Sequence, residues 1–463
     1  MRLQAARLKL QIIALELLFL AAPAEAATYY VATTGDDANP CTQSSPCRTI
    51  ARGSSVLSAG DTLLIRSGTY TESLTNGYQG FSWRNGTSWD NLTRYTNYPN
   101  ETVVLQPFDS VYGVMQFGNT TLYVEVSGLV MDARNAYEAV RLETYNGSEA
   151  KYIRLLNNDI KNSPRHGILG GGSSCEFVNN DIHHNAEYGF YSGASYDGSG
   201  SLYEGNRIHD NGGYAMHIYD AIREVDNNVI RNNVMYNNGT GFWFNGNESP
   251  EWRTPPAVII SEGRNNSFYN NLLYNNHAGL FVGYGAVDSK IFNNTIYGNA
   301  TYGLDVNAAY SGSINAEVIN NIVYGNGASQ LTNDATNTTL HHNLTDQAPR
   351  FMDAANGDFH VQPGSPAIDA GVDLSSRGVT TDLEGIPRPQ GSGFDLGAYE
   401  FRVTTLLRGD LNKDGKRDLT DVRLLIYMLI GQQAKTPEAD LTGDGAVTLA
   451  DVQALIRLLA GIP

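Results

Sequence analysis

The chain has 463 residues, 41% of them hydrophobic, and 48 acidic side chains against 31 lysines and arginines give a net charge of −17. That length is enough for two or three domains with a large buried core. The acidic balance argues against nucleic acid and anionic membrane surfaces as partners. It leaves an acidic glycan open, because a local field in a groove or bound calcium can override the global sign.

Residues 1–26 have the pattern of a secretory signal peptide. Basic residues precede an apolar run, and Ala24-Glu25-Ala26 supplies the small residues of a cleavage site. We therefore expect a secreted, extracellular protein that begins near Ala27. No later segment has ~18 consecutive apolar residues, so no membrane span is expected.

The three cysteines fit an exported protein. In an oxidising compartment Cys41 and Cys47 can form a disulfide across a short loop. Cys175 is expected to be a buried small hydrophobe, because nothing around it would lower its pKa.

One phrase is repeated through the middle of the chain. It begins as "NNDIKNSPRHGIL" at Asn157 and "NNDIHHNAEYGFY" at Asn179, and further copies start at Gly205, Asn232, Asn270, Asn293 and Asn320. The copies start 22 to 38 residues apart. A period in this range, with short β segments bounded by Asn and Gly, indicates an all-β solenoid in which stacked coils share one core.

Alignment of the copies predicts which side chains point inward. One inward column is Ile160, Ile182, Ile208, Met235, Leu273, Ile296 and Val323; a second is Ile168, Phe190, Met216, Phe242, Leu280, Leu304 and Leu331. Asn185, Asn211, Asn238, Asn276, Asn299 and Asn326 recur three places after the first column. We interpret these asparagines as a turn ladder at ~4.8 Å spacing.

The repeat resembles the right-handed parallel β-helix of bacterial carbohydrate-active proteins. Residues 28–70 resemble the start of such proteins, with a capping helix at about Thr49–Leu57 before a first strand in "DTLLIRSGTY". The segments "DFHVQPGSPAIDAG", "DLEGIPRP" and "DLGAYEF" resemble their closing segment. The resemblance implies a β-helix domain over residues 27–401, followed by a linker at 402–408. The fold alone does not fix an activity, since it hosts lyases, hydrolases, epimerases and adhesins.

The composition changes at Gly409. "DLNKDGKRDLTDVRLLIYMLIG" from Asp410 is echoed 30 residues later by "DLTGDGAVTLADVQALIRLLAG" from Asp440. Each copy reads as a calcium loop followed by an amphipathic helix. Loop positions 1, 3, 5 and 12 are Asp410, Asn412, Asp414 and Asp421 in the first copy, and Asp440, Thr442, Asp444 and Asp451 in the second.

The paired loops resemble a type I dockerin over residues 409–463. The resemblance implies two Ca²⁺ ions, a cohesin module of a scaffold protein as partner, and a place at the cell surface or in a cellulosome-type complex. By position, Lys416 and Ala446 would offer carbonyls, and Asp418 and Thr448 the ninth-position contact. Thr442 stands where Asn or Asp is usual, which predicts a weaker second site. Leu419-Thr420 and Leu449-Ala450 occupy the partner-choosing positions, and they leave the cohesin type open.

The outward column beside the first inward one contains Lys161, His183 and His209, then Tyr236, Tyr274, Tyr297 and Tyr324. Stacked potential cations repel each other and gain no stability. We therefore expect an open glycan groove across these coils, in which His183 and His209 face the substrate and the neighbouring His184 does not. Stacking beside Lys161 should favour uncharged imidazoles. A further Ca²⁺ in this groove is an alternative source of positive charge.

These residue types suit β-elimination from a uronic acid, so we predict a polysaccharide lyase. Lys161, His183 or His209 is the candidate base, Tyr188 or Tyr191 the acid, and Arg165 or Arg223 the partner of the sugar carboxylate. Another outward column contains Tyr191, His217 and Trp243. The remaining candidate substrate contacts are Tyr219, Trp252 and Arg253, the last two in an insertion after the fourth copy.

Three alternatives remain open at this point. A C5 epimerase would use the same groups. A glycoside hydrolase needs two carboxyls ~5 to 9.5 Å apart, and Glu187, Asp210 and Asp220 do not form a pair in matching columns of adjacent coils. The third alternative is a non-catalytic glycan-binding or surface protein.

Overall fold

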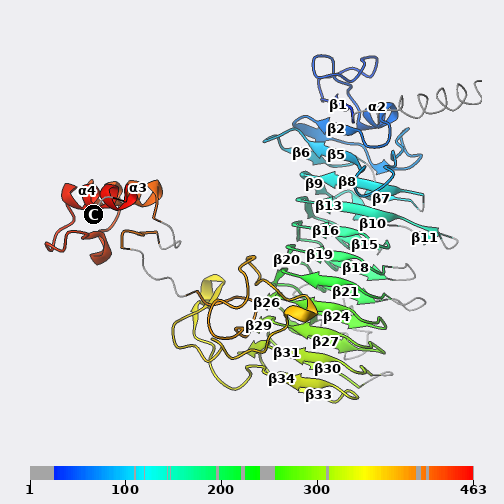
Figure 1. Ribbon diagram of the computed structural model, residues 1–463. Helices are drawn as coiled ribbons and strands as arrows, with labels where there is room; N and C mark the ends of the chain where they lie inside the picture. Colours follow the sequence, from blue (N-terminus) through cyan, green and yellow to red (C-terminus); the bar gives the residue numbers. More distant parts are fainter. Residues whose placement is uncertain are drawn as a thin grey trace, which may run out of the picture. The chain divides into compact units, whose positions relative to one another are not determined.

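The computed structural model describes residues 26–461 apart from 109–110, 119, 143, 146–147, 171, 194–197, 220–224, 240–255, 309–311, 403–407 and 413–416 (Figure 1). The chain divides into two compact units, Met1–Glu400 and Phe401–Pro463. The predicted signal peptide lies outside the described residues, except for Ala26. No helix among the described residues is long and apolar enough to cross a membrane.

The first unit is a solenoid of three parallel sheets (Figure 1). In order, the first sheet contains β1 (Thr28–Val31), β2 (Thr62–Ile65), β5 (Thr93–Asn97), β8 (Leu122–Ser127), β13 (Lys151–Leu156), β16 (Glu176–Val178), β19 (Leu202–Glu204), β22 (Val229–Arg231), β25 (Ser267–Tyr269), β28 (Lys290–Phe292), β31 (Glu317–Ile319) and β34 (Thr339–His341). The second contains β3 (Gly68–Tyr70), β6 (Val103–Leu105), β9 (Leu129–Asp132), β14 (Asp159–Lys161), β17 (Asp181–His183), β20 (Arg207–His209), β23 (Val234–Tyr236), β26 (Leu272–Tyr274), β29 (Thr295–Tyr297) and β32 (Ile322–Tyr324).

The third sheet contains β4 (Leu74–Thr75), β7 (Val111–Phe117), β10 (Ala136–Leu142), β15 (Ile168–Leu169), β18 (Phe190–Gly193), β21 (Met216–Tyr219), β24 (Pro256–Ser261), β27 (Ala278–Gly283), β30 (Tyr302–Val306) and β33 (Ser329–Asn333). Two hairpins lie outside the three sheets, β11 (Thr144–Tyr145) with β12 (Ser148–Glu149) and β35 (Phe351–Asp353) with β36 (Asp358–Val361). Short 3₁₀ turns are η2 (Ala354–Asn356) and η3 (Ser375–Arg377).

The strand register confirms the first predicted inward column and corrects the second. Ile160, Ile182 and Ile208 pair in successive coils and are at most 1% exposed. In the second column, however, Met216 pairs with Val258 of β24, and His217 pairs with Ile259. The places expected for Phe242 and Trp243, which lie outside the described residues, are therefore occupied by Val258 and Ile259 of the fully buried run "PAVIIS".

Two asparagine ladders run along the solenoid at its turns. The predicted ladder from Asn185 to Asn326 is confirmed, with each Nδ2 donating to the Oδ1 one coil later at 2.9–3.1 Å. A second ladder with the same spacing runs from Asn158 to Asn343. At Asn326 the side chain of Gln330, from the same coil, takes the place of a further asparagine: its Oε1 accepts from the Asn326 backbone N–H and Nδ2.

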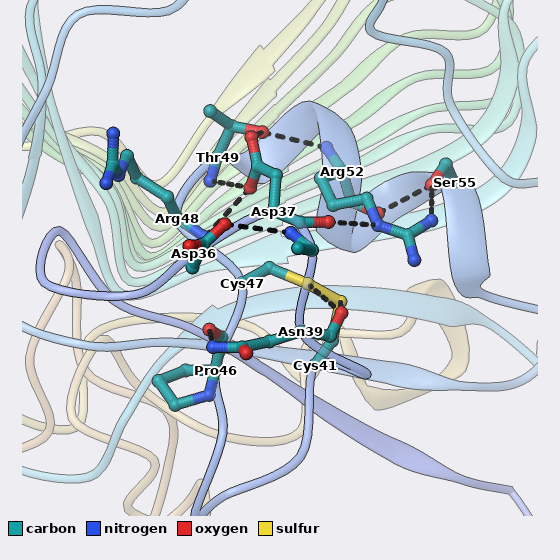
Figure 2. Close-up of a disulfide and its surroundings, with 11 residues drawn as sticks. Asp36, Asp37, Asn39, Cys41, Pro46, Cys47, Arg48, Thr49, Arg52 and Ser55 are labelled. Carbon is teal, nitrogen blue, oxygen red and sulfur yellow. Dashed lines mark hydrogen bonds between the residues drawn. A yellow bond between two sulfur atoms is a disulfide. The ribbon is translucent and has the colours of Figure 1, made fainter.

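The N-terminal end is covered by the predicted capping helix, α2 (Ile50–Val56). Thr49 is its N-cap residue, and Thr49 Oγ1 accepts from the Arg52 N–H. The carboxylate of Asp37 holds the same turn by accepting from the N–H groups of Arg48 and Thr49 (Figure 2). The expected first strand is wrong in order: β1 precedes the helix, and "DTLLIRSGTY" contains both β2 and β3.

The predicted disulfide joins Cys41 and Cys47 beneath this helix, with Cα atoms 4.6 Å apart (Figure 2). Both residues are fully buried. Cys175 is also buried, at 1% exposure, as expected.

The closing segment packs along the side of the solenoid. Phe359 of β36 contacts the rings of Tyr274 and Tyr297, so it covers that part of the tyrosine row. Farther on, Arg388 and Glu400 form a fully buried ion pair at 2.6 Å.

The second unit contains α3 (Leu419–Leu429), η4 (Pro437–Ala439) and α4 (Leu449–Leu459). Asp418 and Thr448 are the N-cap residues of the two helices, and each forms a capping box with Asp421 or Asp451. Leu425 and Leu455 lie in its core and are fully buried. The helices and their N-caps are therefore alike in the two repeats.

Candidate functional site

The predicted site residues lie on two different sheets. Lys161, His183 and His209 are the last residues of β14, β17 and β20 in the second sheet. Tyr191 and His217 occupy β18 and β21 of the third sheet, and they pair in register. Arg165 and Tyr188 lie in the turns between these sheets. We call Lys161, His183 and His209 the histidine row, and the group around Tyr191 and His217 the imidazole–tyrosine cluster.

The histidine row is an ordered stack of rings with carboxylates beside it. The rings of His183 and His209 are 5.0 Å apart and parallel, and His209 is 4.7 Å from Tyr236. His183 Nε2 lies 3.1 Å from Asp159 Oδ1, and Lys161 Nζ lies 2.5 Å from Asp159 Oδ2. The predicted stack is therefore present, but its potential cations are paired with carboxylates.

His209 has a carboxylate at each ring nitrogen. Its Nε2 is 2.9 Å from Asp181 Oδ1, and its Nδ1 is 2.6 Å from Asp210 Oδ2. Although burial opposes the charged form, these two hydrogen bonds raise the pKa of His209. The shift of the pKa is opposite to the expected one, and with both ring nitrogens engaged by carboxylates His209 is a poor base.

His184 occupies a turn position with a left-handed backbone, φ 54°. The equivalent residues of the neighbouring coils, Asn162 and Asp210, have φ 61° and 52°, so this step of the turn is left-handed in each coil. His184 is exposed, but its Nδ1 lies 2.6 Å from His183 Nδ1. It therefore contacts the histidine row from the turn.

The imidazole–tyrosine cluster contains His166, Tyr188, Tyr191, Tyr214 and His217. The ring of His166 lies 5.0 Å from Tyr188 and 5.3 Å from Tyr191. Tyr191 stacks on His217 at 4.9 Å, and His217 also stacks on Tyr219 at 5.0 Å. These contacts bring together four of the predicted site residues, Tyr188, Tyr191, His217 and Tyr219.

Both imidazoles of this cluster are uncharged at neutral pH. His166 and His217 are 3% and 5% exposed, and burial lowers the pKa of each to about 3. Within the described part of the chain, the Nδ1 atom of each is buried without a hydrogen-bond partner. Unpaired buried nitrogens are costly, so these two atoms mark a place where the fold gives up stability.

A network of arginines and glutamates borders the cluster. Glu138 is fully buried and accepts from Arg165 and Arg141, each at 3.0 Å. Glu187 Oε2 lies 3.0 Å from His166 Nε2, and Arg165 Nε lies 3.6 Å from Glu187 Oε1. Burial raises the pKa of Glu187. Because Nε2 of neutral His166 donates to Glu187, its Nδ1 carries the free lone pair.

The sequence prediction omitted His166 and Glu138 from the site. A usable signal existed for His166. Glu187 follows Arg165 by 22 residues, which is the length of one coil, so the register places Glu187 beside Arg165 and next to its neighbour His166. Arg223, Trp243, Trp252 and Arg253 lie outside the described residues, as does Asp220.

The calcium-loop residues offer oxygen ligands, which suit a hard cation such as Ca²⁺. Asp421 is fully buried, and its Oδ1 accepts from the N–H of Leu411. Asp451, its counterpart in the second loop, is also fully buried and accepts from the N–H of Thr442. Asp410 is 3% exposed, so the first loop buries two carboxylates.

These residues fit calcium by their chemistry, but the described atoms do not form a complete site. Asp414 and Lys416 lie outside the described residues. Among the rest, no group of three or more His, Cys, Asp or Glu side chains is arranged to hold a metal ion, in either unit. The two loop ions and a further ion at the β-helix therefore stay predictions.

Comparison with known proteins supports the fold of both units. A model described as "Right handed beta helix region" matches residues 110–254, and one described as "Dockerin type I domain" matches residues 408–460. Pectate lyase Pel9A has a TM-score of 0.61 at 17% identity, over 82% of this chain and 98% of that one. XylC in complex with xylose has 0.53 at 12% identity, over 81% and 98%.

Uncharacterized protein YwoF of Bacillus subtilis (strain 168) is 28% identical over 138 residues, which is 28% of this chain and 28% of that protein. The match thus spans less than a third of the length of that relative. At these identities the structural likeness establishes the fold and leaves the reaction open. By its fold the chain is a right-handed parallel β-helix protein, and residues 408–460 are a type I dockerin domain.

Proposed function

We propose that this chain is a secreted polysaccharide lyase that cleaves a uronic acid-containing glycan by β-elimination at the imidazole–tyrosine cluster. The observation that carries the proposal is the free Nδ1 lone pair of His166, an uncharged imidazole oriented by Glu187 through a 3.0 Å contact. A positioned lone pair is what removal of the proton next to the sugar carboxylate requires.

The neighbouring groups supply the other requirements of the elimination. The Arg165 side chain is 44% exposed, so its guanidinium can meet the sugar carboxylate while it keeps Glu138 as a partner. Bound there, the substrate anion would raise the pKa of His166 and strengthen it as a base. Tyr188 or Tyr191, whose rings adjoin His166, would protonate the departing glycosidic oxygen.

The histidine row has a different role in this proposal. Lys161, His183 and His209 are engaged with carboxylates, so we assign them to holding the second sheet beside the site. His217 and Tyr219 support Tyr191 by stacking. The dockerin would tether the enzyme to a cohesin-bearing scaffold through the exposed Leu419 and Leu449, which are 78% and 62% exposed.

The test is a product assay on pectate, alginate and glycosaminoglycans, following absorbance of the unsaturated product. His166→Gln is expected to lower turnover by ~10²–10⁴-fold, the usual loss of a general base. His209→Ala is the matched control and should retain most activity. New reducing ends without unsaturated product would indicate a hydrolase. If His166→Gln keeps full activity and His209→Ala loses it, the general base belongs to the histidine row and this proposal is wrong.

The tether is tested separately by binding to immobilised cohesin modules in calcium. The double variant Leu419→Asp, Leu449→Asp should lose binding and keep lyase activity. Retention of binding by this variant would refute the assignment of these two leucines.

A further inference from the structure

Two tyrosines on the third sheet have their rings in solvent. Tyr112 of β7 and Tyr137 of β10 are 71% and 51% exposed, with ring centroids 6.0 Å apart and planes inclined by 28°. The guanidinium carbon of Arg141 lies 5.7 Å from the centre of the Tyr112 ring. Two exposed aromatic rings side by side form a candidate binding surface.

The tyrosine row on the second sheet has a structural purpose that this pair lacks. Tyr274 and Tyr297 there are covered by Phe359 of the closing segment. Tyr112 and Tyr137 keep more than half of their surface in solvent, so little of their area stabilises the fold. Another explanation is therefore needed for the exposed pair.

The strand register aligns this pair with the proposed active site. Ala136 pairs with Val111 and Glu138 with Gly113, so Tyr137 lies next to Tyr112. Val140 pairs with Ile168. Counting three places back on both strands puts Tyr137 beside Arg165. Glu187 is in the next coil, and its N–H donates to the carbonyl of Arg165. Tyr112, Tyr137, Arg165 and Glu187 thus form one column over four successive coils.

The column has the chemistry and the spacing of an extended sugar site. Neighbouring parallel strands are ~4.8 Å apart, which is close to the length of one sugar unit in a polysaccharide. The C–H face of a sugar ring packs against an aromatic ring, as other apolar surfaces do. Arg141 beside Tyr112 supplies a donor for a sugar carboxylate.

We infer that Tyr112 and Tyr137 form a platform that binds a uronic acid-containing polysaccharide on the N-terminal side of Arg165. The polymer would run parallel to the solenoid axis, with about one sugar unit for each coil. The inference rests on the proposed function for the identity of the polymer. It adds a binding site one and two coils away from Arg165, on its N-terminal side.

The test measures binding and turnover in the same variants. Retardation in gels that contain polygalacturonate, alginate or neutral xylan reports binding without catalysis. The double variant Tyr112→Ala, Tyr137→Ala should weaken binding to an acidic polymer by about tenfold or more, the loss of one or two aromatic contacts. KM should rise by a similar factor while kcat is unchanged. The matched pair of Tyr→Phe substitutions should behave like the wild type, and Tyr427→Ala in the dockerin should leave retardation unchanged.

The outcomes separate this inference from the proposed function. The double alanine variant could be retarded as strongly as the wild type, while His166→Gln still abolishes turnover. That result would overturn the platform and leave the proposed lyase intact. Loss of retardation in the double variant, with no turnover of any polymer by the wild type, would support the platform and overturn the lyase. Equal or stronger retardation by neutral xylan would refute the preference for an acidic polymer.

Discussion

Replacing His217 by Phe should remove a large part of the acid sensitivity of the β-helix. His217 is 5% exposed, and burial lowers its pKa to about 3 in the folded protein. In the unfolded chain a histidine has a pKa of ~6.5, so between these values the unfolded state binds the proton and stability falls as the pH falls. pH 5 lies ~1.5 units below the pKa of the unfolded chain, so at pH 5 this proton uptake lowers the free energy of unfolding by about 2 kcal/mol.

The experiment compares urea unfolding of the wild type and His217→Phe at pH 7 and pH 5. Phe keeps an aromatic ring to stack on Tyr191 and Tyr219 and cannot titrate. The wild type should lose about 2 kcal/mol more than the variant on going from pH 7 to pH 5. Parallel stability changes in the two proteins would show that His217 is protonated at its ordinary pKa, which would refute the account of a dry, uncharged imidazole.

Further predictions concern the histidine row, the ladder and the dockerin. His209→Gln should cost about 1–2 kcal/mol near pH 5–6, where both His209 and its carboxylates are charged. The cost should shrink as the pH rises through the raised pKa of His209, and again as the pH falls through the lowered pKa values of Asp181 and Asp210; a cost independent of pH would contradict the ion pairs. Asn238→Ala should cost about 3 kcal/mol, since its buried Nδ2 makes three hydrogen bonds, whereas the exposed Asn356→Ala should change unfolding little. A chelator should remove the circular dichroism signal of α3 and α4 and leave the β-helix folded; an unchanged helical signal would argue against calcium-dependent folding.

The sequence was sufficient for the repeat because each coil supplies an inward apolar residue and a ladder asparagine at fixed spacing. Phe242 was misplaced because one apolar run ends the fourth copy of the phrase and a second, "PAVIIS", follows it. A local pattern cannot tell which of the two runs pairs with β21. In the structure Val258, from the second run, pairs with Met216 of β21.

The electrostatics of the histidine row were harder to predict than its geometry. The prediction used the column neighbours, which placed Lys161 beside the imidazoles. The stronger partners of His209 are Asp181, from the preceding coil, and Asp210, the next residue in the chain. In the imidazole–tyrosine cluster, burial of His166 and His217 sets their pKa values, and the repeat pattern alone does not reveal the burial of side chains at an outer face or a turn.

Gln330, at the end of the ladder that runs from Asn185 to Asn326, has a consequence for end-to-end association of the protein. A solenoid resembles a short cross-β fibril, whose last layer offers unpaired amides to the first layer of another molecule. Gln330 occupies the Asn326 amide from within the same coil, and its own Nε2 donates to the Asn326 carbonyl. An incoming chain therefore finds this ladder already closed, and the final coil cannot use it as a template for end-to-end growth.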